Sequence, residues 1–407
     1  MSEARAIAEE TARASYGRLL AWLCARTGDV AAAEDALAEA FRAALEHWPQ
    51  SGVPASAEAW IITAARRKLI DQGRKAKTRM DAEPALALAA EEAEAKANMD
   101  SPFPDERLKL MFICAHPAIE ENIRTPLMLQ TVLGLDAARI ASAFLTSPKA
   151  MGARLVRAKR KIKAASVPFT EPPLEQLPQR MSAVLDAIYA AFGTGWNEVD
   201  GAGQTGDLTH EAIFLAQLVT SLAPDRAEAW GLLSLMLHAE ARREARHSNG
   251  AYVPLSSQDT SLWDRRMIAA AEQALATAWR LNDMGRFQLE AAIQSAHAAS
   301  RLHERDVSQD VILLYENLIR IAPSAGAEIG YAAALSSAMR FQDALDVLDR
   351  IEKERVETHQ PFWAVRAHVC KGLGRASEAD AAYDRAIGLS DNDAARSFLR
   401  SQKTAPV

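Results

Sequence analysis

The sequence predicts an all-α protein with two small helical domains followed by a helical-repeat domain. Three observations support this prediction: alanine is abundant, runs of β-branched residues are scarce, and apolar residues recur at helical spacing. Of 407 residues, 49% are hydrophobic and 25% are charged, which is typical of globular proteins rather than disordered or fibrous ones. A chain of this length is expected to fold as more than one domain.

The first predicted domain, residues 10–80, is a small bundle of helices. Two of its helices have apolar stripes, formed by Tyr16, Leu19, Leu20 and Leu23 and by Ala33, Leu37, Phe41 and Leu45. Pro49, Gly52 and Pro54 are expected to break the second helix, and Ser56 to cap a third. The apolar side of the third helix is expected to contain Trp60, Ile61, Ala64, Leu69 and Ile70.

A second helical domain is predicted at residues 105–165, between an acidic linker at 81–104 and a proline-rich linker at 166–180. Its last part has the pattern of a helix-turn-helix. Asp136 is a candidate N-cap for a helix that buries Ala137, Ile140, Ala141 and Phe144. Pro148 suits the first position of the next helix, whose apolar face contains Met151, Leu155 and Ala158.

Basic residues gather in two segments, although the formal net charge is -6. Residues 66–79 contain seven basic residues and one acid, and residues 149–163 contain seven basic residues and no acid. Such clusters can bind phosphate while the whole molecule is anionic. In the helix-turn-helix, the second helix would enter the major groove. An ordinary solvated helix hairpin is the alternative. The residues expected to contact DNA there are Ser147, Lys149, Arg154, Arg157, Lys159, Arg160 and Lys161.

From residue 181 to 407 the sequence predicts stacked helical hairpins similar to tetratricopeptide repeats. The supporting residues lie at equivalent positions of successive units: Ala212, Ala216 and Val219; Val311, Tyr315 and Leu318; Ala344, Leu348 and Ile351; Ala379, Tyr383 and Ala386. Trp230 and Trp363 fall where such repeats often have a large residue in their first helix. An irregular helical bundle is the alternative, because alanine-rich helices match loose patterns easily.

The first two domains together resemble sigma factors of the extracytoplasmic-function class. Residues 33–41 (Ala-Glu-Asp-Ala-Leu-Ala-Glu-Ala-Phe), 59–61 (Ala-Trp-Ile) and 66–74 (Arg-Arg-Lys-Leu-Ile-Asp-Gln-Gly-Arg) are similar to the family's second conserved region. Residues 105–165 resemble its fourth region, which binds the minus-thirty-five promoter element. Ala38 stands where the family usually has Gln, and Gly152 stands at a frequently basic position.

The resemblance implies two further sets of contacts. Core RNA polymerase would be bound by Glu34, Asp35, Glu39 and Phe41. The minus-ten promoter element would be bound by Trp60, Arg66, Arg67, Lys68, Arg74 and Lys75. An acidic helix with an aromatic residue suits docking because charge steers association and an aromatic ring is an effective anchor when buried.

The C-terminal half resembles a subgroup of this class that has a long helical extension with tetratricopeptide-like repeats. The matching stretches are 105–112, 114–117, 258–259 and 262–265, whereas 191–196 (Ala-Phe-Gly-Thr-Gly-Trp) replaces the subgroup's Phe-Asn-Glu-Gly-Tyr. We expect this extension to regulate the first two domains through protein contacts, with a regulatory protein as a candidate partner.

Other functions are less favoured by the sequence. Cys24, Cys114 and Cys370 show no metal or redox spacing, and no catalytic motif stands out, so we expect neither an enzyme nor a cofactor or metal. No secretory signal and no apolar run long enough to cross a membrane is visible, which favours the cytoplasm. A one-component helix-turn-helix regulator with a ligand-sensing domain remains an alternative, although it would not need the segment at 33–41.

Overall fold

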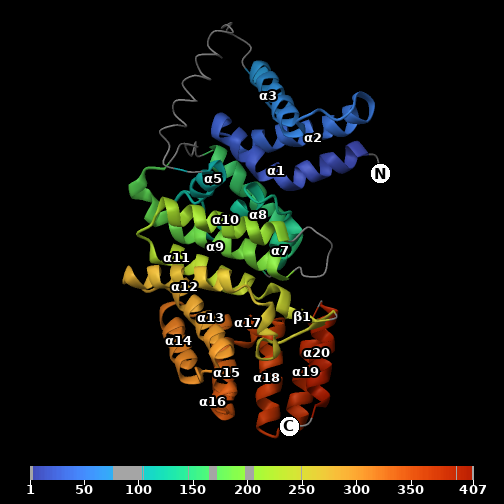
Figure 1. Ribbon diagram of the computed structural model, residues 1–407. Helices are drawn as coiled ribbons and strands as arrows, with labels where there is room; N and C mark the ends of the chain where they lie inside the picture. The colour runs from blue at the N-terminus through green and yellow to red at the C-terminus, as the bar shows by residue number, and fades with distance from the viewer. Residues whose placement is uncertain are drawn as a thin grey trace. The chain divides into compact units, whose positions relative to one another are not determined.

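The computed structural model describes residues 3–76, 103, 105–144, 146–164, 172–197, 206–248, 250–390 and 392–405. The chain divides into two compact units, Met1–Leu222 and Ala223–Val407. Most of the described residues lie in helices, and the strands among them form a short antiparallel hairpin (Figure 1). The predicted all-α fold class is confirmed. None of the described helices is long and apolar enough to span a membrane.

The first unit contains two groups of helices and a final pair. The first domain consists of α1 (Glu3–Thr27), α2 (Val30–Ser51) and α3 (Ala57–Ala76). The second domain consists of α5 (Glu106–Cys114), α6 (Glu121–Thr131), α7 (Ala137–Ala143) and α8 (Pro148–Ala164). The short η1 (Leu174–Gln176), α9 (Leu177–Asn197) and α10 (Gly206–Leu222) follow.

The ends of the helices in the first domain follow from local chemistry. Gly28 has a φ of 63°, and the Asp29 carboxylate accepts a hydrogen bond from the Ala32 amide at 3.1 Å, so α2 begins just after α1 ends. Helix α2 passes through Pro49 and ends at Ser51, so the predicted break falls at Gly52 rather than at Pro49. Pro49 has no amide hydrogen to donate, but the next turn is still closed, because the Gly52 amide donates to the Trp48 carbonyl at 3.0 Å.

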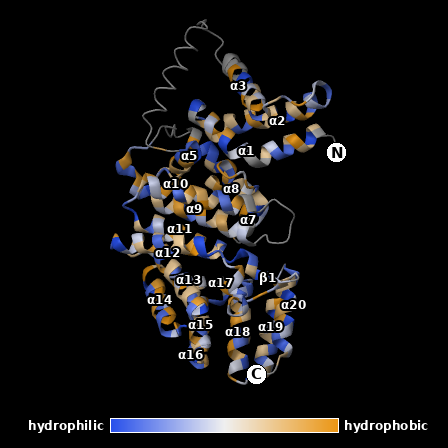
Figure 2. Cartoon of the chain, viewed as in Figure 1, coloured by the Kyte–Doolittle hydropathy of each residue, from blue (hydrophilic) through white to orange (hydrophobic). Residues whose placement is uncertain are grey.

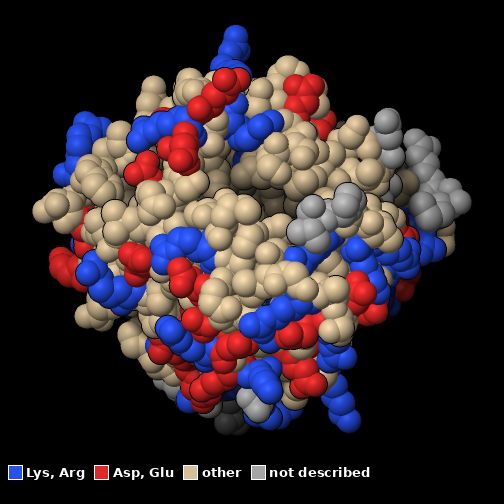
Figure 3. Space-filling view, turned by 90° about the horizontal axis from the view of Figure 1, so that it is seen from below, with Lys and Arg blue, Asp and Glu red and all other residues tan. Residues whose placement is uncertain are grey.

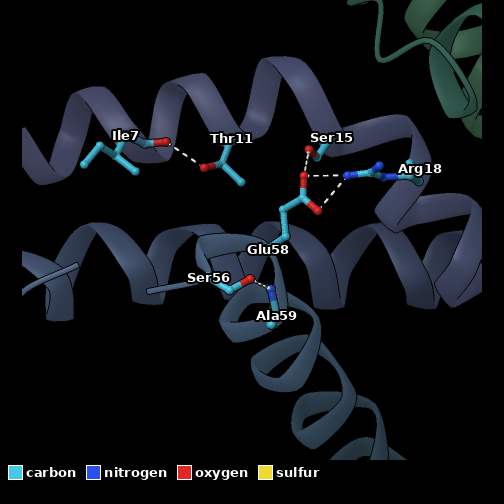
Figure 4. Close-up of polar contacts among 7 residues, drawn as sticks. All are labelled: Ile7, Thr11, Ser15, Arg18, Ser56, Glu58 and Ala59. Atoms are coloured by element: carbon cyan, nitrogen blue, oxygen red, sulfur yellow. Dashed lines mark hydrogen bonds and ion pairs between the residues drawn. The ribbon is translucent and has the colours of Figure 1, made fainter. Parts of the chain in front are cut away.

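Glu58 at the start of α3 ties this helix to α1 (Figure 4). Its Oε1 accepts a hydrogen bond from the Ser15 hydroxyl, and the Arg18 guanidinium lies 2.5 and 2.6 Å from its two oxygens. The Ser56 hydroxyl accepts from the Ala59 amide at 3.3 Å, which confirms the predicted cap. Arg18 and Glu58 are exposed, so their ion pair orients the helices more than it stabilises them.

Three apolar residues assigned to buried stripes are exposed instead. Leu45 is 46% exposed, Ile70 is 51% exposed and Phe144 is 38% exposed. With about 100° per residue, Leu45 is turned about 120° from buried Ala33, and Ile70 lies opposite buried Ile61. Phe144 follows the end of α7, so it no longer belongs to the helix face that buries Ile140. The buried side of α2 continues instead through Ala40, Ala44 and Trp48.

The two helices predicted within residues 135–163 begin where the sequence predicts. The Asp136 carboxylate accepts hydrogen bonds from the Ala138 and Arg139 amides at 2.8 and 2.9 Å, which confirms the N-cap. Pro148 is the first residue of α8. The buried face of α8 contains the predicted Met151, Leu155 and Ala158, together with Ile162.

The first and second domains pack directly against each other within the first unit. Helix α1 contacts α5 and α6. Gly17 in α1 faces the backbone that follows α6, and a Cβ atom at Gly17 would lie 1.8 Å from the Val132 carbonyl oxygen. Gly134, with a φ of 68°, turns the chain beside the Tyr16 ring. Only a glycine permits the approach at residue 17, because the obstacle is backbone rather than a movable side chain.

Helices α9 and α10 belong to the first unit, although the sequence groups them with the repeats. Arg180 in α9 is 4% exposed and donates to the Phe112 carbonyl at 2.9 Å. Arg107 in α5 forms an ion pair with Glu211 in α10. These contacts attach the two helices to the second domain. The boundary between the two units therefore lies after Leu222 and not at the proline-rich linker.

The second unit is a succession of helices with a short hairpin near its start. Its long helices are α11 (Ala227–Glu240), α12 (Arg265–Arg280), α13 (Arg286–His303), α14 (Ser308–Ile321), α15 (Ala325–Ser337), α16 (Phe341–Arg350), α18 (Gln360–Gly372), α19 (Ala376–Gly388) and α20 (Asp393–Thr404). Shorter elements are η2 (Arg243–Arg246), β1 (His247–Ser248), β2 (Ala251–Tyr252), η3 (Leu255–Ser257), η4 (Thr260–Leu262) and α17 (Lys353–Val356). Apolar and polar residues alternate around the helices (Figure 2).

Neighbouring helices of the second unit pack in chain order. Helix α13 contacts α14, α14 contacts α15, α15 contacts α16 and α18, and α16 contacts α18, whereas the last helix, α20, contacts β2 near the start of the unit. Glu228 in α11 accepts hydrogen bonds from the Phe287 and Gln288 amides at 3.0 Å each, which satisfies the start of α13. The two tryptophans expected at matching repeat positions, Trp230 and Trp363, each donate to the carbonyl six residues earlier at 3.0 Å. Stacked hairpins would produce this order of contacts, and the tetratricopeptide-like class stays a prediction.

Candidate functional site

Helix α8 presents a basic face opposite its buried one. Ser147, Lys149, Arg154, Arg157, Arg160 and Lys161 are all exposed. Arg154, Arg157 and Lys161 follow at intervals of three and four residues, so they share one side over about 10 Å of helix. The Ser147 hydroxyl accepts from the Ala150 amide at 3.2 Å, so this predicted DNA contact also caps α8. A basic helix face of this length suits the major groove of duplex DNA.

Two of the basic residues of α8 have acidic partners. Lys161 Nζ lies 3.1 Å from Glu120, and both side chains are more than half exposed, so this pair is weak and easily exchanged for phosphate. Lys159 differs, because its amine lies 2.7 and 2.5 Å from the two carboxylate oxygens of Glu34 in α2. The side chains of Lys159 and Glu34 are only 14% and 19% exposed.

The predicted minus-ten contacts lie along α3. Arg66 and Arg67 are exposed, and the Arg66 guanidinium carbon is 5.7 Å from the centroid of the Trp22 ring. Lys68 forms an ion pair with Glu39 at 3.3 Å. Trp60 is half-buried and packs edge-on against Trp48, with ring centroids 5.5 Å apart. The side chains of Arg74 and Lys75, in the last turn of α3, lie outside the described residues.

The four residues expected to bind polymerase lie on α2 in different surroundings. Asp35 is exposed, and Phe41 is half-buried beside Tyr16, with ring centroids 6.5 Å apart. Glu39 lies 2.7 Å from Arg42, and the hydrogen bonds from Arg42 and Lys68 lower the pKa of its carboxyl. Glu34 is the member whose carboxylate faces the second domain, through Lys159.

The surroundings of the Glu34–Lys159 pair are buried. Burial, and then the nearby Glu34 carboxylate, raises the pKa of the Tyr16 hydroxyl. Burial also raises the pKa of Cys24 in α1 and raises the pKa of Cys114 in α5 to about 12. The interface between the first and second domains is therefore largely shielded from solvent at this point, and a paired charge there is screened less than at the surface.

The sequence identified most of these basic and acidic residues but not their partners. Glu34 and Lys159 are 125 residues apart, and Arg180 and Phe112 are 68 residues apart. No periodicity joins positions so distant. The importance of Gly17 was also missed, although a glycine inside a long helical pattern is a signal of close packing.

Comparison with known proteins supports the resemblance of the first domain to sigma factors. The sigma-70 region 2 family matches residues 12–79, and a family of unknown function (DUF6596) matches residues 180–279. The chain is 36% identical over 377 residues to "Uncharacterized protein R00370" of Rhizobium meliloti (strain 1021), which covers 91% of this chain and 89% of the relative. No solved structure matches the chain.

The fold and these matches define an all-α, sigma-factor-like protein of transcription initiation, with a sigma-70 region 2 domain at its N-terminal end. More particularly, the chain belongs to the same family as the Rhizobium meliloti protein R00370.

Proposed function

We propose that this protein is a sigma factor of the extracytoplasmic-function class, which binds core RNA polymerase and directs initiation at specific promoters. The observation that most supports the proposal is the combination of a sigma-70 region 2 domain with a separate exposed basic helix, α8. The first would contact the polymerase and the minus-ten element, and the second would contact the minus-thirty-five element.

In this proposal α8 is the recognition helix of a helix-turn-helix. Its buried face attaches it to the second domain, and α7 precedes it after a short turn. Arg154 and Arg157 are exposed and one turn apart, so both can reach the same groove. Arginine can bind phosphate or reach a guanine edge with two hydrogen bonds, which suits both positioning and readout.

In the first domain, α2 would provide the polymerase contact and α3 the contact with opened DNA. Asp35 is exposed on α2, while Phe41 is half-buried and therefore partly accessible to a partner. Arg66 and Arg67 are exposed on α3, where they can neutralise phosphates of a single strand.

The second unit would regulate the first through protein contacts. It is a series of helices, most of which pack against a near neighbour along the chain while α20 contacts β2, and stacked helices of this kind offer surfaces to peptides or partner helices. On the face shown in Figure 3, acidic and basic side chains are interspersed, which favours a specific protein contact over a phosphate backbone.

Transcription with purified core polymerase on genomic fragments tests the proposal. We expect the full chain to co-purify with core polymerase and to start transcripts at discrete positions. Arg157→Ala should weaken promoter binding, whereas Arg320→Ala, which removes the same charge from an exposed site in α14, should not. Binding of promoter DNA without any association with polymerase would instead indicate a one-component regulator.

The role of the second unit can be tested by ending the chain after Leu222. This boundary keeps α9 and α10, whose contacts through Arg180 and Glu211 support the second domain. We expect circular dichroism to show that the shortened protein is still helical. We expect its promoter activity to differ from that of the full chain. Identical activity in cells would contradict a regulatory role.

A further inference from the structure

Two neighbouring arginines that follow α11 differ in their partners. Arg243 donates to both carboxylate oxygens of Glu240 at 2.7 Å, so an acid balances its charge. Arg242 instead bonds two neutral acceptors: its Nε donates to the His238 carbonyl at 3.0 Å, and its Nη2 donates to the Gln294 side-chain oxygen at 2.5 Å. Within the part of the chain that the structure describes, no carboxylate forms an ion pair with Arg242. Arg242 is therefore a cation whose charge no described acid balances.

The surroundings of Arg242 make such a charge costly. Its side chain is partly buried, and its guanidinium carbon lies 5.8 Å from the centroid of the buried Trp263 ring. Burial, and then the positive charge of Arg246, lowers the pKa of Arg242 to about 10. Charged groups inside proteins are normally balanced by a group of opposite charge, because water no longer solvates them well. The arrangement therefore favours an anion beside Arg242.

His297 in α13 lies beside Arg242 and adds a possible donor. Gln294, which bonds Arg242, and His297 are three residues apart in α13, so their side chains share one face of that helix. Burial, and then Arg242, lowers the pKa of the His297 imidazole, so the ring is mostly neutral near pH 7 and keeps one N–H donor. The ring forms no hydrogen bond with the residues that the structure describes.

The tryptophan ring beside Arg242 has an unsatisfied donor of its own. Trp263 is 3% exposed, and its indole N–H has no hydrogen-bond partner among the described residues. Buried polar groups are normally hydrogen-bonded, so a leftover donor indicates an acceptor from outside the chain, such as an ion or a water molecule. Arg242, His297 and Trp263 thus bring N–H donors together without an acid. Such a combination suits the oxygen atoms of an anion.

We propose that Arg242, Arg246 and His297 form a binding site for a small oxyanion, either a phosphate or a carboxylate group carried by a small molecule. Arginine binds both groups well, because its planar guanidinium presents a fork of N–H donors. All three side chains are partly exposed, so small solutes can reach them. A nucleic-acid backbone suits the site poorly, because these side chains are partly buried and the neighbouring Glu244 is exposed. The site does not depend on the proposed function.

The site lies where the beginning of the second unit meets its last helix. Tyr252 in β2 packs edge-on against Phe398 in α20, with ring centroids 5.5 Å apart. Tyr252 also acts electrostatically on Arg242 and Arg246, so the hairpin, the site and α20 are neighbours. An anion that holds the two arginines in place would therefore also strengthen the contact between the hairpin and α20.

Isothermal titration calorimetry of the full chain tests the site, with inorganic phosphate and succinate as probes at constant ionic strength. We expect at least one probe to bind, and Arg242→Gln to weaken its binding by about tenfold or more, because a charge-assisted hydrogen bond is lost. His297→Ala should weaken the same binding. Arg320→Gln is the matched control, because it removes an arginine from an exposed position in α14 and should leave the affinity unchanged.

Hydrogen exchange would locate the bound anion on the chain. We expect the probe that binds to slow exchange of the backbone amides at residues 242–263 and in α20, because the site and the hairpin are held together. Exchange in α14 should be unchanged. Slowing that is confined to other segments would contradict the proposed position of the site.

The outcomes either identify the class of ligand or overturn the inference. Binding of phosphate alone would indicate a phosphorylated ligand, binding of succinate alone would indicate a carboxylic acid, and each result would support the site. Binding of neither probe, or equal affinity in Arg242→Gln and the unmodified chain, would overturn it. If circular dichroism shows that Arg242→Gln does not fold, His297→Ala decides in its place, and an unchanged affinity in that variant would overturn the site.

Discussion

Substitution of Gly17 by alanine is a direct test of the contact between the first and second domains. Gly17 lies inside α1, where alanine would normally stabilise a helix by about 1 kcal/mol relative to glycine. Here an added Cβ would lie 1.8 Å from the Val132 carbonyl oxygen and 2.9 Å from its carbonyl carbon. An ordinary contact would require α1 to move away by about 1.5 Å.

The expected net effect is destabilisation. Overpacking typically costs up to about 3 kcal/mol, and this obstacle is backbone, so the upper end of the range applies. After subtraction of the gain in helix propensity, about 2 kcal/mol remains. For a folding unit of this size, that difference lowers the midpoint of thermal unfolding by roughly 4–8 °C.

Thermal and denaturant unfolding of the full chain would measure the effect, with Gly152→Ala as the control. Gly152 also lies in a helix, but nothing lies within 4 Å of its added Cβ, so alanine should stabilise the protein by about 1 kcal/mol. If Gly17→Ala were stabilising to the same extent, α1 and the end of α6 would not be in contact in solution, and the reasoning would be refuted.

Three further predictions concern DNA binding, pH and thiol reactivity. Arg157→Ala should reduce the slope of log affinity against log salt by about one; an unchanged slope in a fluorescence-anisotropy titration would show that this residue contacts no phosphate. Burial, with a smaller effect of Arg242, lowers the pKa of His297 in the folded state below its ordinary 6.5. The unfolded chain therefore binds the proton first, and stability should be complete above pH 6.5 and decline as pH falls below it. Denaturant titrations at pH 7.5 and 5.5 would measure this loss, and the free energy of unfolding should fall less for His297→Gln than for the unmodified protein. Equal losses would contradict the assignment to His297. Cys24, Cys114 and Cys370 are buried and have raised pKa values, so a chromogenic disulfide should label them slowly in the native protein and rapidly in denaturant; rapid native labelling would show that a core is open.

Local signals in the sequence were sufficient for several structural features. The N-caps at Ser56 and Asp136 and the start of α8 at Pro148 depend on groups within a few residues of each other. The buried face of α8 also followed from its own periodicity. These predictions are correct because capping and helical amphipathicity are local properties.

The predicted apolar faces of the helices were wrong where the helical spacing was extended over too many residues. Steps of four residues turn about 40° farther around the helix each time, so Leu45 left the face that Ala33 begins. Phe144 failed for another reason, because α7 ends before it. The position of Leu45 follows from helical geometry, whereas the position of Phe144 depends on where α7 ends, which residue types alone do not fix.

The sequence by itself determined the all-α class, the segregation of charge into two basic helices and the resemblance to sigma factors, because helix propensity, spacing and motif are properties of short segments. Only the tertiary structure decided that Glu34 meets Lys159, that Gly17 meets Val132 and that α9 and α10 pack with the second domain. Those contacts join residues up to 125 positions apart. They arise from the way apolar faces are buried together, which no local pattern specifies.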